Sequence, residues 1–356
     1  MFDPALGHWL DARAQALDLG NQEPEDVLTQ LAGVDVLRIG VAAESGGAGG
    51  NVADAVEAVA AVARHSLAAA FVFWGQRAFI EYLLQSPNAA LRERLLPELL
   101  QARLAGATGL SNAMKFLSGM EALQVRASAG NDGWALDGRL HWVTNLRKSG
   151  FVVAAAIEPP AGESPFVLAI PDGLYGLRRS DDLQLMGLQS TNTAALDFSG
   201  VSVKREWLLH GDARQFLPTV RPAFLGLQCG MSIGLARRSL EEVSLHLEGT
   251  RSVLNDEHQH QRQHLEATAG ELKAGLLDRR FLSRPAELFR LRIALAESVA
   301  NAVQLELQAS GGKAFLNEHG SAFARRWRES AFVPIVTPSL VQLRAELRRQ
   351  AGDQPA

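Results

Sequence analysis

Apolar residues change their spacing twice along the 356-residue chain, which divides it into three zones. From residue 1 to about 105 they recur every three or four positions, as in DAVEAVAAVARHSLAAAFVFW, and this spacing predicts amphipathic helices. A glycine-rich loop, AAESGGAGG at 42–50, interrupts this zone. The loop lacks the Lys and Ser/Thr of a phosphate-binding P-loop, so we interpret it as a structural turn.

Between residues 106 and 205 the apolar positions alternate instead. The segment LQVRASAGNDGWALDGRLHWVTN contains two alternating runs around Asn131-Asp132-Gly133, a pattern typical of a β-hairpin. Short β-rich runs follow at FVVAAAIEPP, PFVLAIP and ALDFSGVSV. Several short strands at this spacing predict a small barrel or sandwich.

Residues 206–356 return to long helical segments. Those segments are RPAFLGLQCGMSIGLARRSLEEVSLHLEG, HLEATAGELKAGLLDRR, PAELFRLRIALAESVANAVQLELQAS and SLVQLRAELRR. They predict a helical bundle. We therefore expect an α+β chain with three domains: a helical one at 1–105, a β-domain at 106–205 and a helical bundle at 206–356.

Composition narrows the class of protein. Hydrophobic residues make up 47% and charged residues 21%, as in globular proteins, and a net charge of −4 without a basic patch argues against nucleic-acid binding. The single cysteine, Cys229, excludes an internal disulfide and reads as a core residue. No signal peptide and no uninterrupted run of about 18 apolar residues are evident, so we expect a cytoplasmic protein with no membrane span.

Three histidines, His258, His260 and His264, suggest a metal site at first sight. Two residues that are two apart on a helix point to different faces, so a solvated face or loop is the better interpretation.

Six motifs resemble those of the acyl-CoA dehydrogenase superfamily, in the same order. They are AAESGGAGG, ERLLPELLQARLAGATGLSN, GWALDGRLHWVTN, LMGLQSTNTAALDFSGVSVKREWLL, QASGGKAF and FARRWRES. The resemblance covers nearly the whole chain. It implies an acyl-CoA dehydrogenase-like fold: an N-terminal helical domain, a small central β-barrel that contacts a flavin, and a C-terminal four-helix bundle.

The resemblance also implies FAD and assigns residues to its ring. Trp142 would back the isoalloxazine, the Thr144 hydroxyl would reach its N5 side, and Ser111 would meet its pyrimidine end. Considered without the family, Trp142 is an ordinary strand aromatic and Thr144 a solvent-facing β-branched residue.

The adenine and pyrophosphate end of FAD is held by a neighbouring subunit in this family. The corresponding positions here are Arg251, Gln308, Gly311 and Gly312, while Leu254 replaces an aromatic residue. An Arg fork suits a pyrophosphate. The resemblance therefore implies a homodimer or homotetramer.

The position of the family's catalytic carboxylate falls on Thr337, which is not a base at neutral pH. Glu329 and Glu346 lie nearby in sequence, and we interpret both as surface or salt-bridge residues.

Three hypotheses follow. The first is an FAD-dependent oxidoreductase acting on a small molecule such as an acyl-CoA, with an electron-transfer flavoprotein or oxygen as acceptor. The second is a flavin monooxygenase of the same fold; such relatives also lack the Glu, but commonly lose the Trp-Ile-Thr-Asn motif that Trp142 and Thr144 preserve. The third is a non-catalytic relative. We favour the first.

Overall fold

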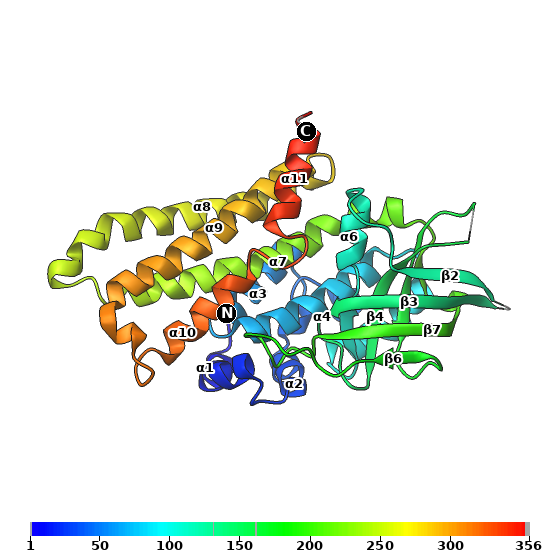
Figure 1. Cartoon of the computed structure of the whole chain (residues 1–356), viewed down its shortest axis with the longest axis horizontal. Coiled ribbons are helices and arrows are strands. Elements are labelled where there is room, and N and C mark those ends of the chain that lie inside the picture. Colours follow the sequence, from blue (N-terminus) through cyan, green and yellow to red (C-terminus); the bar gives the residue numbers. More distant parts are fainter. Residues whose placement is uncertain (1, 131, 161, 353–356) are drawn as a thin grey trace.

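The computed structural model describes residues 2–130, 132–160 and 162–352. Strands gather at one end of the molecule, and long helices extend away from them (Figure 1). Helix α4 runs between the two parts, so it contacts both the sheets and the helical bundle. The sequence's three zones are thus confirmed as a helical, a β and a second helical region.

The N-terminal region consists of helices α1 (Pro4–Leu19), α2 (Glu25–Gly33), α3 (Val52–Ala63), α4 (Leu67–Gln85) and α5 (Ala89–Leu100). The apolar run at 54–74 is not one helix, because Ser66 caps α4 by accepting a hydrogen bond from the Ala69 N–H (3.3 Å). Helix α4 has the length and mean hydropathy of a membrane span, but 94% of that apolar window is buried. Such burial is typical of the core helix of a folded domain.

Two four-stranded sheets form the β-region. One has the order β1-β4-β5-β8 and the other β2-β3-β7-β6. Their bounds are β1 (Ala105–Thr108), β2 (Val125–Gly130), β3 (Gly133–Val143), β4 (Phe151–Ile157), β5 (Phe166–Pro171), β6 (Leu177–Arg179), β7 (Ala194–Lys204) and β8 (Leu208–His210). A short helix, α6 (Ser111–Leu117), follows β1.

The predicted hairpin is present, since β2 and β3 pair from Val125 with Gly138 to Gly130 with Gly133. Asn131 of its turn lies outside the described residues. The alternation along β3 is not strict, because its pairing with β7 shifts register between Leu136 and Gly138 and again between Leu140 and Val143. Such bulges re-aim side chains, and the second one contains Trp142.

The C-terminal region consists of α7 (Ala213–Ser244), α8 (Asn255–Leu277), α9 (Pro285–Ser310), α10 (Ser321–Phe332) and α11 (Leu340–Gln350). Helix α7 begins eight residues before the segment predicted from Arg221, and α8 nine residues before that predicted from His264. Cys229 lies in the core as expected, and burial raises the pKa of its thiol to about 12.

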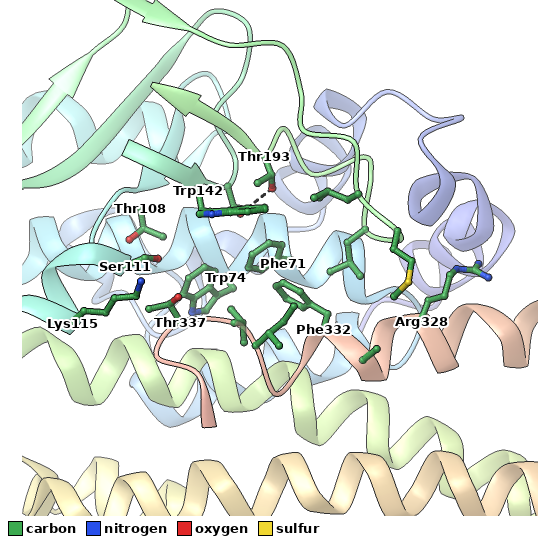
Figure 2. Close-up of a pocket in the computed structure, with 18 residues that line it drawn as sticks. Phe71, Trp74, Thr108, Ser111, Lys115, Trp142, Thr193, Arg328, Phe332 and Thr337 are labelled. Atoms are coloured by element: carbon green, nitrogen blue, oxygen red, sulfur yellow. Dashed lines mark hydrogen bonds between the residues drawn. The ribbon is translucent and has the colours of Figure 1, made fainter. Parts of the chain in front are cut away.

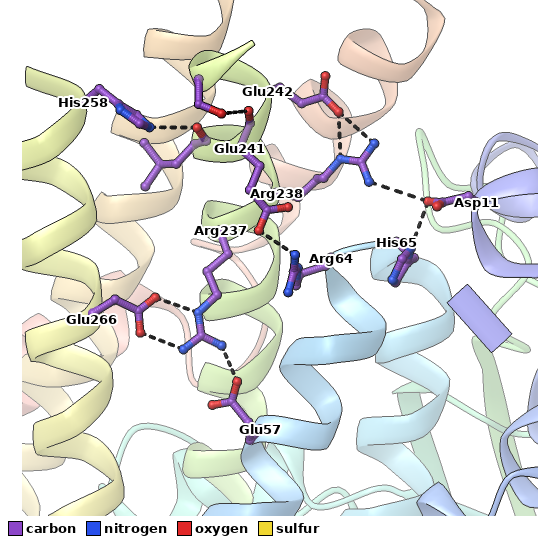
Figure 3. Close-up of polar contacts among 12 residues, drawn as sticks. Asp11, Glu57, Arg64, His65, Arg237, Arg238, Glu241, Glu242, His258 and Glu266 are labelled. Atoms are coloured by element: carbon purple, nitrogen blue, oxygen red, sulfur yellow. Dashed lines mark hydrogen bonds and ion pairs between the residues drawn. The ribbon is translucent and has the colours of Figure 1, made fainter. Parts of the chain in front are cut away.

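Ion pairs join α3, α7 and α8, with Arg237 of α7 between Glu57 of α3 and Glu266 of α8 (Figure 3). Arg237 donates to both oxygens of Glu266 at 2.7 and 2.8 Å, and these hydrogen bonds are the main cause that lowers the pKa of Glu266. His258 is buried and its Nε2 lies 2.9 Å from the Leu240 carbonyl oxygen, whereas His260 and His264 are exposed. The described part of the chain holds no group of three potential metal ligands.

Two glycines let α7 approach α3. A Cβ atom on Gly234 would lie 2.1 Å from the Ala60 carbonyl oxygen, and one on Gly230 would lie 2.6 Å from that of Val56. Both obstacles are backbone atoms, so the helices would have to move apart to admit a side chain.

We expect Gly234→Ala to lower the free energy of unfolding by about 1–3 kcal/mol, because overpacking a helix contact costs more than alanine's helix propensity returns. Urea denaturation measures the change. Gly270→Ala is the matched control: Gly270 lies in α8 with nothing within 4 Å of its virtual Cβ, so alanine should stabilise by up to about 1 kcal/mol. Equal effects at the two sites would contradict this packing.

Candidate active site

A cavity of about 390 Å³ lies between the end of β3 and the helices α4 and α10 (Figure 2). Four of the predicted site residues line it: Ser111, Trp142, Thr144 and Thr337. They come from α6, the end of β3 and the segment that follows α10. The fold therefore brings together residues that are more than 200 positions apart in sequence.

Trp142 covers one side of the cavity. Its indole is seen edge-on above the Phe71 and Trp74 rings in Figure 2 and is 63% exposed. Between Leu140 and Val143, β3 has one more residue than β7 has between Leu196 and Ala194, and this bulge turns Trp142 out of the regular ladder. A large aromatic face so exposed beside a cavity is suited to stacking with a flat ligand.

Thr144, by contrast, is buried at the cavity wall. Its Oγ1 lies 3.0 Å from that of Thr193, which lies 2.8 Å from that of Thr191. Thr191 also donates to the Leu188 carbonyl oxygen (2.9 Å). Since hydroxyl groups both donate and accept, this chain leaves Thr144 and Thr193 able to hydrogen-bond a ligand. Thr193 was not predicted; the hydroxyl-rich run before β7 was the available signal.

Asn145 fixes the end of β3 behind Thr144. Its backbone is left-handed (φ 60°), and its side-chain amide donates to Gln76 and to the Gly106 carbonyl oxygen, both at 2.9 Å. These bonds join β3 to α4 and β1. The motif's final Asn is therefore a structural anchor that sets the direction of Thr144.

A second cavity of about 210 Å³ adjoins the first, and both are lined by Ser111, Lys115, Trp142 and Thr337. Lys115 is one helical turn beyond Ser111 and pairs with Glu121 at 2.7 Å. That hydrogen bond is the main cause that lowers the pKa of Glu121. The second cavity is the more polar of the two, since Glu121 and His141 line it as well.

Thr337 lines both cavities, and the Gln228 side chain holds its carbonyl oxygen at 3.0 Å. Gln228 in turn accepts a hydrogen bond from the buried Arg292 (2.9 Å), which also donates to the Val333 carbonyl oxygen (2.7 Å). Both ends of the 333–337 segment are thereby tied to the bundle.

No carboxylate lines the larger cavity among the residues the structure describes. Glu329 is fully buried, accepts from the Leu67 N–H at 3.0 Å and pairs with Arg325 at 2.7 Å. Glu346 is also buried and pairs with Arg349 at 2.6 Å. The interpretation of both as salt-bridge residues is confirmed. Glu329 pairs with Arg325 in the interior, whereas the buried Glu346 pairs with Arg349, whose side chain is exposed at the surface.

Arg328 brings a positive charge to the cavity wall, and Asp18 neutralises it. Asp18 is fully buried, accepts from Arg328 at 2.6 and 2.9 Å, and also accepts from the Leu188 N–H at 2.8 Å. The end of α1 thus supports two parts of the cavity wall.

Arg251, Gln308, Gly311 and Gly312 lie elsewhere, where α8 begins and α9 ends, at the end of the bundle away from the sheets (Figure 1). A Cβ atom on Gly311 would lie 3.0 Å from the Arg251 guanidinium, so these two residues are close neighbours. Neither described cavity at Trp142 includes any of the four. One chain therefore carries two separate groups of predicted cofactor residues.

Comparison with known proteins agrees with this architecture. Residues 9–103 match the family described as acyl-CoA dehydrogenase, N-terminal domain. The mitochondrial isovaleryl-CoA dehydrogenase of Pongo abelii is 24% identical over 207 residues, which are 56% of this chain and 48% of that protein. The match thus spans about half the length of this curated relative.

Solved structures match over nearly the whole chain. A glutaryl-coenzyme A dehydrogenase complexed with glutaryl-CoA superposes with a TM-score of 0.84 at 18% identity, covering 99% of this chain and 94% of that one. KijD3 in complex with FMN and a dTDP-sugar gives 0.80 at 18% identity, covering 99% and 92%. A dibenzothiophene monooxygenase from Paenibacillus sp. A11-2 gives 0.78 at 16% identity, covering 99% and 96%.

Residues 9–103 thus match the acyl-CoA dehydrogenase N-terminal family, the whole chain shares the fold of the acyl-CoA dehydrogenases, and these findings together support membership of the acyl-CoA dehydrogenase superfamily.

Proposed function

We propose that the protein is an FAD-dependent oxidoreductase of the acyl-CoA dehydrogenase type that removes a hydride from an acyl thioester or a related small substrate. The observation that carries the proposal is the convergence of Ser111, Trp142, Thr144 and Thr337 on one cavity. Membership of the superfamily supports the same reaction class.

The residues around the cavity fit a flavin ring. Trp142 presents a flat apolar face, and the hydroxyl groups of Thr144, Thr193 and Ser111 stand at the wall to meet polar ring edges. Bound FAD would supply two-electron chemistry at N5 of its ring. The aliphatic and aromatic side chains opposite Trp142 would shield the reacting atoms from water.

Proton removal is the step for which the described residues that line the larger cavity offer no carboxylate. Thr337 is a neutral alcohol that can orient a substrate by a hydrogen bond but cannot take its proton at pH 7. This feature favours a second candidate function, a flavin-dependent monooxygenase that uses reduced flavin and oxygen. The fold shared with the dibenzothiophene monooxygenase is compatible with it. Because Trp142 and Thr144 preserve the motif that such monooxygenases commonly lose, we still favour the dehydrogenase type over the monooxygenase.

Anaerobic titration separates the two functions. Purified protein of the first type is yellow, and its visible absorbance bleaches when an acyl-CoA from a panel of chain shapes is added. Admitting oxygen or an electron-transfer flavoprotein then identifies the acceptor. Colourless protein that binds reduced flavin and consumes oxygen would replace the first function by the second.

Restoring a carboxylate tests the position of Thr337. We expect Thr337→Glu to raise α,β-desaturation of an acyl-CoA by about 10²–10⁴-fold, the usual contribution of a positioned general base. Dye reduction under anaerobic conditions measures the rate. Thr337→Gln introduces a side chain of the same size as Glu that cannot act as a base, so this variant should show no increase in the desaturation rate. A flavin-loaded Glu variant as inactive as the Gln variant would contradict this placement.

We also propose that a second copy completes the cofactor site, giving a homodimer or homotetramer. The group around Arg251 and Gly311 is distant along the bundle from Trp142, and its neighbours Val253 and Phe315 are 80% and 82% exposed. Light scattering after size exclusion tests this. A monomer at micromolar concentration with full flavin content would refute it.

A further inference from the structure

The cavity wall opposite Trp142 is built from aromatic rings. Phe71 and Trp74 of α4 and Phe332 of α10 line it (Figure 2). Phe71 and Trp74 are stacked, with ring centroids 5.4 Å apart and planes 9° apart, and Phe332 meets Phe71 edge-on at 4.8 Å. The wall therefore consists of two nearly parallel rings, Phe71 and Trp74, with the Phe332 ring in edge contact with Phe71.

This wall is held rigidly. The Trp74 indole N–H donates to the Phe224 carbonyl oxygen of α7 at 3.1 Å, and the Phe224 ring packs edge-on against the indole at 5.1 Å. Trp74 is 2% exposed and Phe71 is 7% exposed. Neither ring can swing away without breaking core packing, so the cavity ends at α4 and does not continue toward α7.

Size and polarity restrict what occupies the space before the wall. A cavity of about 390 Å³ must hold the flavin ring together with the reacting part of the substrate. Leu188, Ile335 and Val336 line it beside the aromatic rings, and its two cations, Arg328 and Lys115, already pair with Asp18 and Glu121. The inner part thus suits a compact, uncharged group with flat faces.

We propose that the reacting part of the substrate is a compact aromatic or cyclic group, and that Phe71 and Trp74 select it against straight aliphatic chains. The proposal rests on the oxidoreductase function above and names its substrate class. A planar substrate ring can stack on the parallel Phe71 and Trp74 rings. A long acyl chain instead meets the closed end of the cavity and loses conformational freedom on binding.

The selection is tested by measuring, with calorimetry, the affinities of two thioesters that share the CoA group and differ in the acyl group. We expect 3-phenylpropionyl-CoA to bind the purified protein about tenfold more tightly than octanoyl-CoA. Phe71→Leu should reduce this ratio several-fold by removing one stacked ring, and Trp74→Leu should do the same while admitting the longer chain better. Circular dichroism confirms that each variant is folded.

Phe73→Leu is the matched control, since Phe73 is equally buried in α4 but lines none of the cavities at the site. It should leave the ratio unchanged even if it lowers stability. The proposal would be overturned by any of three results: the two thioesters bind equally well, neither of them binds, or Phe71→Leu and Phe73→Leu change the affinity ratio to the same extent.

Flavin content, measured in the same samples, separates this proposal from the function on which it rests. If the protein contains no flavin but still binds the phenyl compound more tightly, the proposed oxidoreductase function is refuted and substrate selection by Phe71 and Trp74 is supported. Flavin-loaded protein that bleaches fastest with octanoyl-CoA would support the oxidation and refute the selection.

Discussion

Trp142→Ala is expected to weaken flavin binding by about 10–100-fold. The indole supplies the flat face on one side of the cavity, and losing such a stacked surface costs roughly 1.5–3 kcal/mol. Since the side chain is 63% exposed, the free energy of unfolding of the unliganded protein should change little. Fluorescence titration of flavin into unliganded protein measures the affinity, and urea denaturation measures the stability.

Tyr175→Ala serves as the control for this variant. Tyr175 is 96% exposed and belongs to the loop before β6, away from the cavity. It should leave flavin affinity as it is in the unaltered protein. If the two alanine variants bound flavin equally well, the ring could not lie against Trp142, and the cofactor assignment would fail.

Arg326→Met is expected to lower the free energy of unfolding by about 3–5 kcal/mol, because it leaves the buried carboxylate of Glu306 without its partner. Arg326 Nε lies 3.0 and 3.1 Å from the two Glu306 oxygens, and both side chains are almost fully buried between α9 and α10. Urea denaturation monitored by circular dichroism measures the loss.

The double variant Arg326→Met/Glu306→Met should recover most of that stability, since a well-packed apolar pair often replaces a buried ion pair without cost. A single variant that costs less than about 1 kcal/mol, or a double variant no better than the single one, would show that the pair does not hold α10 in place. Helix α10 carries Arg328 and Phe332 into the cavity wall, so flavin binding should fall with stability in the single variant.

The fold could be predicted from local patterns because apolar spacing reports which face of each segment is buried. The helix at 285–310 followed from that spacing almost to its ends, while the strands at 151–157 and 166–171 followed from short continuous apolar runs. The break at Ser66 depends on one capping hydroxyl, and the bulge at Trp142 depends on the pairing of β3 with β7. The spacing of apolar residues alone predicts neither the helix break nor the bulge.

The candidate site was predictable only where one short segment carries it. Trp142 and Thr144 lie two residues apart, so a single motif located both. The aromatic wall unites Phe71 with Phe332 across 261 positions, and the burial of Glu329 depends on Arg325 and on the start of α4. Such contacts arise from helix packing, which no local pattern encodes.

The bonds made by Asp18 have a consequence for how the chain can be shortened. Helix α1 lies far from the cavity in sequence, but its last turn neutralises Arg328 and holds the backbone at Leu188. The adjoining Leu17 and Asp18 carbonyl oxygens also receive the Ser190 and Gln189 N–H groups. A chain trimmed to begin after α1 would leave the Arg328 guanidinium at the cavity wall without its carboxylate partner and would free the backbone at 188–190, so the last turn of α1 supports the cavity wall.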